Sequence, residues 1–277
     1  MSTITAADIN KLRQATGAGM LDCRKALTES NGDFEAAIDW LRKQGQKVAA
    51  KRSDREAKEG VILAKTSADQ KVGFVVCISC ETDFVSKNAE FVAFAQTIAD
   101  AAVANDVKSA EELNAVVING TTVADMINDK LASIGEKIAV AKFERIEAPY
   151  VASYIHGSNR MGVLVGLSAE AAEVGKDLAM QIAAMNPVAV DPESVPAETV
   201  ARERAIIIDT MKEDPKMAGK PEEMIAKIAE GKIGAFFKEQ TLLAQAFVKD
   251  GSKTVGEHIK SVDSNLKVTA FVRVALG

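Results

Sequence analysis

Hydrophobic and polar residues follow a helical period over residues 1–45 of the chain. Three short runs place apolar residues at three- and four-residue steps, and glycine-containing segments separate these runs at 16–19 and 31–32. Thr5 stands where it can cap the first run, and Asp33 opens the third. The pattern therefore predicts an N-terminal module of three short helices.

The basic residues that follow this module predict a linker. A bundle as small as 1–45 has a thin core, which is typical of a compact recognition module, and it resembles the three-helix domains that bind ubiquitin. Residues 42–58 carry seven Lys or Arg residues against two acidic ones and include no aromatic residue. We interpret this stretch as an exposed linker helix, and we place the basic linker between the module and the core at residues 46–59. An RNA-binding arm is the alternative, but it would lack the aromatic side chains on which bases stack, so we expect no direct contact with nucleic acid.

Beyond the linker, a pattern of two strands followed by an amphipathic helix occurs twice. In each copy the strands are joined by a short polar turn, and a helix start and a further strand close the copy in the same order. Four matches in one order predict an internal duplication. The corresponding segments of the first and second copies are 60–64 and 151–156, 72–80 and 161–167, 122–127 and 254–259, and 140–145 and 268–273.

We predict an α+β fold in which each copy is a small antiparallel sheet covered by helices. The core then divides into one subdomain at 60–148 and another at 149–277. The second subdomain carries an insertion at 187–252, with helical segments around 196–212 and 220–240. A helical hairpin that packs on itself is the simpler interpretation of this insertion. An arm that forms a homodimer is the alternative, because two helices alone bury little apolar surface.

Composition and charge limit the functions that this fold can serve. The 277 residues are enough for about two domains, and a formal charge of −5 gives no overall attraction to nucleic acid or anionic lipid. No apolar stretch approaches the ~18 residues that span a bilayer, and the first ten residues lack the pattern of a signal peptide. Three cysteines cannot all pair, which fits a reducing compartment. We expect a cytoplasmic protein without a membrane partner.

Motifs for enzyme catalysis are missing from the sequence. His156 and His258 lie outside any catalytic motif, and no glycine-rich phosphate-binding loop occurs. Cys77 and Cys80 have the spacing of a redox or half-zinc motif, but they end an apolar strand, with no second pair to complete a metal site. We interpret them as small buried apolar residues and expect no enzyme, cofactor or metal. A thiol oxidoreductase remains the alternative that these cysteines leave open.

The connection at residues 81–88 contains an apolar residue where short polar residues are expected. It joins a buried strand to an amphipathic helix, and Ser86 or Asn88 can cap that helix. Phe84 does not fit the demand for capping residues. One interpretation is a hydrophobic staple, in which Phe84 or Val85 folds back on the following helix. The other is an exposed aromatic anchor that enters a pocket on a partner.

Two segments of the chain carry a resemblance to a known family. Residues 12–27 are similar to the first signature of the bacterial elongation factor Ts family, and residues 80–85 are similar to its second. Residues 153–157 and 251–255 look like further landmarks of the same family. The resemblance covers nearly the whole chain. It implies a guanine-nucleotide exchange factor that binds GDP-bound elongation factor Tu, displaces Mg²⁺ and promotes GDP release so that GTP can bind.

The resemblance also implies three groups of partner-binding residues. The first group enters the GTPase domain of the partner near its magnesium site, with Phe84 as the wedge. The N-terminal module docks on the same domain, and the second subdomain meets a different domain. The groups are Thr82, Asp83, Phe84 and Val85; Arg13, Met20 and Leu21; and His156, Phe247 and Val248.

Two departures from the family pattern affect these expectations. Leu21 stands where some relatives have methionine, which is a swap that nearly conserves volume and should cost little. The chain stops at Gly277, whereas some relatives continue into a further helix that touches the partner, so we expect that contact to be missing or replaced. An adaptor of the ubiquitin-binding type is a third hypothesis, suggested by the three-helix start. It leaves the duplicated core without a role.

Overall fold

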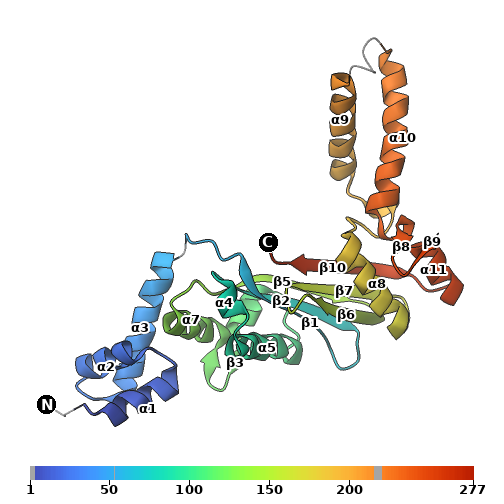
Figure 1. Cartoon of the computed structure of the whole chain (residues 1–277). Coiled ribbons are helices and arrows are strands. Elements are labelled where there is room, and N and C mark those ends of the chain that lie inside the picture. The colour runs from blue at the N-terminus through green and yellow to red at the C-terminus, as the bar shows by residue number, and fades with distance from the viewer. Residues whose placement is uncertain (1–3, 53, 215–219) are drawn as a thin grey trace.

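The computed structural model describes residues 4–52, 54–214 and 220–277, which form helices and small antiparallel sheets (Figure 1). The three N-terminal helices and a long helical hairpin lie at opposite ends of the molecule, with two sheets between them. This mixture confirms the predicted α+β class. Within the described ranges, no helix is both long enough and apolar enough to cross a membrane.

The first two N-terminal helices begin and end close to the predicted positions, and the third begins where predicted. The Thr5 side chain accepts a hydrogen bond from the Asp8 amide, and the Asp8 carboxylate accepts one from the Thr5 amide, which caps the first helix as predicted. Leu12, Cys23 and Leu27 form the small core of the module. The helices are α1 (Ala6–Thr16), α2 (Met20–Glu29) and α3 (Phe34–Arg52).

Helix α3 does not end near Gly45, where the predicted module ends, but continues to Arg52. Gly45 is buried against α7 (Val123–Ile134), and a Cβ atom there would lie 2.9 Å from the Cβ of Ala132. The glycine therefore allows two helices to approach closely and does not act as a helix stop. As a result, α3 joins the N-terminal module to the first subdomain.

The first sheet has the strand order β1-β2-β5 with antiparallel pairing throughout. Phe74 and Ile78 from its central strand pack against Phe91 and Ile98 of α5, and these side chains are almost fully buried. The elements of the first subdomain are β1 (Glu59–Thr66), β2 (Val72–Cys80), α4 (Asp83–Ser86), α5 (Ala89–Ala104), α6 (Ala110–Ala115), the separate pair β3 (Val117–Ile118) and β4 (Thr121–Thr122), α7 and β5 (Ala139–Glu147).

The second sheet has the strand order β10-β7-β6, with antiparallel pairing. The two sheets correspond: β2 and β7 are the central strands, and the last strands, β5 and β10, lie at an edge. Leu178 and Ile182 of α8 cover the second sheet. The elements of this subdomain, apart from the hairpin, are β6 (Tyr150–His156), β7 (Met161–Leu167), α8 (Ala172–Met185), the 3-10 turns η1 (Pro192–Ser194) and η3 (Leu242–Ala244), β8 (Ala246–Phe247), β9 (Asp250–Thr254), α11 (Val255–Val262) and β10 (Val268–Ala275).

The two sheets contact each other through their remaining faces. Ile62 and Val75 of the first sheet share a buried apolar cluster with Leu164 of the second. A Cβ atom at Gly162 would lie 2.8 Å from Ile62, so this glycine permits the close approach. The Ile62 amide also donates a 2.8 Å hydrogen bond to the carbonyl of Asn159. Backbone and side-chain contacts therefore join the two subdomains directly.

The predicted insertion contains a hairpin of two long helices, α9 (Ala197–Glu213) and α10 (Glu222–Gln240), which projects from the second subdomain (Figure 1). Their positions agree with the two predicted helical segments. Met211, Ile225 and Ala229 form a small buried cluster between them, and Arg204 forms an ion pair with Glu230 at 2.9 Å. The hairpin thus packs on itself, as the simpler interpretation expected.

Candidate partner-binding site

The connection between β2 and α5 forms α4, a single helical turn that ends at Ser86. Asn88 caps the next helix, because its Oδ1 accepts hydrogen bonds from the amides of Glu90 and Phe91 at 2.8 and 3.4 Å. This confirms one of the two predicted caps. The turn is therefore held between a buried strand and a capped helix.

Phe84 is the most exposed large apolar side chain of the described residues, with 85% of its surface accessible. Its neighbour Val85 is partly buried and packs against the core of the first subdomain. Successive residues of a helical turn point about 100° apart, so one faces inward and the other outward. The staple interpretation is wrong for Phe84, while Val85 takes the inward position. Phe84 is left as an aromatic ring on the surface.

Charges beside the ring are arranged along the same turn. The Asp83 carboxylate accepts a 2.6 Å hydrogen bond from the Lys87 ammonium group, and this bond holds the pKa of Asp83 below its usual value. Both side chains are well exposed to solvent, so the pair contributes little to stability. The ring is therefore flanked by a carboxylate that stays ionised at neutral pH.

The three residues predicted in the N-terminal module lie on its surface. Leu21 is 81% exposed and Met20 is 44% exposed, at the start of α2, while Arg13 is exposed in the last turn of α1. Leu21 and Met20 do not join the module's core, which is formed by other residues of α2. An exposed pair of large apolar residues is a usable contact for a partner.

The residues predicted in the second subdomain do not share one environment. His156 is exposed at the end of β6, with its Nδ1 atom 2.9 Å from the Tyr154 hydroxyl. Phe247 is only 3% exposed and stacks on the ring of His258, with centroids 4.1 Å apart and planes at 12°. Val248 is 48% exposed. Phe247 thus belongs to the core, and its prediction as a surface contact is wrong, because α11 covers it.

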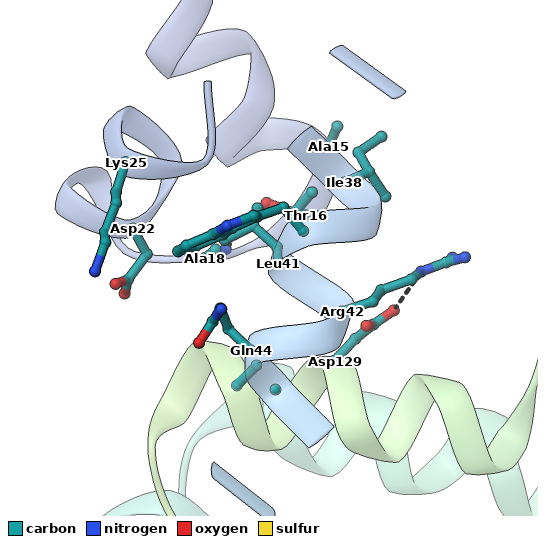
Figure 2. Close-up of a pocket in the computed structure, with 13 residues that line it drawn as sticks. Ala15, Thr16, Ala18, Asp22, Lys25, Ile38, Leu41, Arg42, Gln44 and Asp129 are labelled. Carbon is teal, nitrogen blue, oxygen red and sulfur yellow. Dashed lines mark hydrogen bonds and ion pairs between the residues drawn. The ribbon is translucent and has the colours of Figure 1, made fainter. Parts of the chain in front are cut away.

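A cavity of about 350 Å³ lies between the N-terminal module and α7 (Figure 2). Arg42 and Asp129 meet on one side of it, 3.8 Å apart, and Asp22 and Lys25 lie on the other. Partial burial raises the pKa of Asp129. None of the predicted partner-binding residues lines this cavity. It marks the junction where α3 rests on the first subdomain.

Cys77 and Cys80 lie on opposite faces of β2. Cys77 belongs to the cluster between the two sheets, whereas Cys80 belongs to the cluster under α5. A three-residue step along a strand reverses the side-chain direction, so these two thiols do not face each other. Burial raises the pKa of Cys77 to about 11 and that of Cys80 to about 12. Among the described residues, no cluster of three histidine, cysteine or carboxylate side chains is placed to hold a metal ion.

We expect the two thiols of β2 to be unreactive in the folded protein. At pH 8 both remain protonated, and the thiolate is the reactive form, so iodoacetamide should label them only after unfolding or as the pH approaches 11. Mass spectrometry of labelled native and denatured protein measures this directly. Rapid labelling of both residues in the native protein at pH 8 would restore the oxidoreductase hypothesis.

Comparison with known proteins identifies relatives over the full chain. A family model described as elongation factor TS matches residues 81–277. Proteins named elongation factor Ts from Flavobacterium psychrophilum and Christiangramia forsetii are 49% and 48% identical, over the whole of both chains in each case. The protein of that name from Methylococcus capsulatus is 44% identical over 99% of this chain and 92% of its own length.

Proposed function

We propose that this chain, which belongs to the elongation factor Ts family and is therefore a translation elongation factor, acts as the guanine-nucleotide exchange factor of elongation factor Tu. It binds the GDP-bound GTPase, displaces the Mg²⁺ ion from it and promotes GDP release, so that GTP can bind. The chain needs no catalytic residue, cofactor or metal of its own for this task. Because translation takes place in the cytoplasm, we place its activity there.

The observation that carries this proposal is the exposed ring of Phe84. Burial of a phenylalanine side chain contributes roughly 1.5–3 kcal/mol, which corresponds to about one to two factors of ten in an equilibrium constant. This free energy is gained only if the partner adopts a conformation that accepts the ring. Thr82, Asp83 and Val85 hold the turn that carries it. When the ring is bound beside the magnesium site of the partner, it favours the conformation of the partner in which the Mg²⁺ ligands are displaced.

Thermodynamic linkage explains how this contact releases the nucleotide. A factor that lowers the affinity for GDP by a given ratio must itself bind less tightly, by the same ratio, when GDP is present. The factor therefore needs no contact with GDP or Mg²⁺. It needs only an interface that fits the nucleotide-free partner better than the GDP-bound one.

Two further surfaces supply the rest of the affinity in this proposal. The module of residues 1–45, joined through the linker 46–59, docks on the GTPase domain through Arg13, Met20 and Leu21. The subdomain at 149–277 meets another domain of the partner through His156 and Val248. We also propose that this subdomain and the one at 60–148 are copies of one unit, which the common strand order of their sheets supports.

The other hypotheses have less support. A thiol oxidoreductase is disfavoured by the separate faces and raised pKa values of Cys77 and Cys80. An adaptor of the ubiquitin-binding type finds no support in the relatives, which carry the name of a translation factor. Homodimer formation through the 187–252 insertion stays a prediction. The hairpin buries an apolar cluster between its own two helices, so it does not need a second copy of the chain to do so.

Stopped-flow fluorescence tests the proposed function. Elongation factor Tu loaded with a fluorescent GDP analogue is mixed with excess unlabelled GDP, with and without the factor. We expect the factor to accelerate release in a concentration-dependent manner, and added GDP to weaken binding between the two proteins. An unchanged release rate at saturating factor, with the complex demonstrably formed, would contradict the proposal.

A further inference from the structure

In the first subdomain, the connection between β2 and α4 and the connection between α7 and β5 are joined by reciprocal hydrogen bonds. The Glu136 carboxylate accepts hydrogen bonds from the amides of Glu81 and Thr82, both at 3.0 Å, and from the Thr82 hydroxyl at 2.6 Å. In return, the Glu81 carboxylate accepts a 2.7 Å hydrogen bond from the amide of Lys137. We call this pair of side chains, Glu81 and Glu136, the carboxylate clamp.

The clamp also reaches the C-terminal end of α3 and the residues just after it. The Glu81 carboxylate, whose side chain is 16% exposed, forms ion pairs with Arg52 and Arg55, each at 3.0 Å. Arg52 is the last residue of α3, so one carboxylate connects that helix with both short connections. The Lys137 amide is the main reason that the pKa of Glu81 lies below its usual value, and the two arginines add to the effect. Glu81 is therefore ionised at neutral pH.

The position of the clamp relates it directly to Phe84. Thr82 precedes α4, and its hydroxyl does not cap that helix, because it is bound to Glu136. A single helical turn has little stability of its own. With 85% of its surface exposed, the Phe84 side chain gains little support from its own protein. The direction of the ring thus depends on the backbone, which is anchored by Val85 on one side and by the clamp on the other.

We propose that Glu136 is a positioning residue for nucleotide exchange, which holds α4 so that Phe84 faces the partner before the two proteins meet. This inference rests on the proposed function of Phe84 and assigns a role to a residue 52 positions away in the sequence. An ordered turn binds without the loss of conformational freedom that a disordered turn would suffer. Glu136 itself need not touch the partner.

Substitution of Glu136 separates this role from a general effect on folding. Glu136→Ala removes all three hydrogen bonds, and we expect factor-stimulated GDP release to become about threefold to tenfold slower. Glu136→Gln keeps an acceptor for the two amides and a group that can bond the Thr82 hydroxyl, so it should retain most of the rate. Glu144→Ala is the matched control, because Glu144 is exposed on β5 and lies outside the clamp. Thermal unfolding verifies that each variant is folded.

A double-mutant cycle with Phe84→Ala decides whether Glu136 acts through the ring. If it does, adding Glu136→Ala to Phe84→Ala slows release no further. Two independent, additive losses would overturn the proposal, as would a normal rate for the folded Glu136→Ala variant. A loss of similar size in Glu144→Ala or in Glu136→Gln would also contradict it.

Amide hydrogen exchange gives a readout that does not depend on the partner. The amides of Glu81 and Thr82 should lose protection in Glu136→Ala and keep it in Glu136→Gln. If Phe84→Ala leaves GDP release unchanged, the proposed function of Phe84 is wrong, and the exchange data then decide the clamp separately. Unchanged protection in Glu136→Ala rejects the clamp, whereas lost protection at these two amides upholds it.

Discussion

Replacing Phe84 by alanine is expected to slow factor-stimulated GDP release from elongation factor Tu by about one to two orders of magnitude. The reason is that the ring is 85% exposed in the free protein, and the variant would lose the roughly 1.5–3 kcal/mol that the proposed burial in the partner contributes. The fold should not change, because the ring makes no part of the core clusters. Stopped-flow release of a fluorescent GDP analogue measures the rate.

Two controls sharpen this experiment. Val262 is also an exposed apolar residue, at 58%, but lies in α11, outside the proposed contacts, so Val262→Ala should leave release unchanged. Val85→Ala should lower the thermal unfolding temperature, because Val85 packs on the core. A normal release rate with Phe84→Ala, measured on protein with native circular dichroism, would refute the wedge.

Replacing Leu21 by aspartate is expected to weaken the complex with nucleotide-free elongation factor Tu by at least about 30-fold. Loss of a leucine that is buried in the proposed interface costs about 2 kcal/mol, and a carboxylate placed in that apolar contact adds the cost of its desolvation. The free protein should tolerate the change, because Leu21 is 81% exposed. Isothermal titration calorimetry measures the dissociation constant.

The control for this substitution is Ala36→Asp. Ala36 is exposed in the first turn of α3, where a negative charge is favourable, and it belongs to none of the proposed contacts. Its variant should bind with unchanged affinity. Full affinity of Leu21→Asp would show that the N-terminal module does not dock through α2.

Local sequence signals were sufficient for most of the secondary structure. The predicted strands at 72–80 and 161–167 have the observed bounds, Val72–Cys80 and Met161–Leu167, because turn residues and apolar runs define them without help from distant segments. The continuity of α3 through Gly45 was not predicted in this way. The sequence predicted one helix before Gly45 and a separate linker helix after it, whereas the structure has a single helix whose glycine lies against α7.

The candidate site shows the same division between local and distant causes. The sequence allowed Phe84 to be either folded inward or exposed. Which of the two occurs depends on which residue of α4 contacts the core, and in the structure that residue is Val85. Phe247 was expected at the surface only because the family resemblance implied a contact there, yet it stacks on His258 eleven residues later. Glu136 carries no sequence signal that relates it to Thr82. Its role depends on two connections that meet only in the folded subdomain.

The most direct test of the central claim is a crosslink from position 84. A photoreactive phenylalanine analogue at this position is irradiated in the complex with nucleotide-free elongation factor Tu, and the linked peptide is identified by mass spectrometry. We expect the link to fall in the GTPase domain, beside the residues that hold Mg²⁺. A link to another domain, or no link in a complex that forms with normal affinity, would show that Phe84 does not act at the magnesium site.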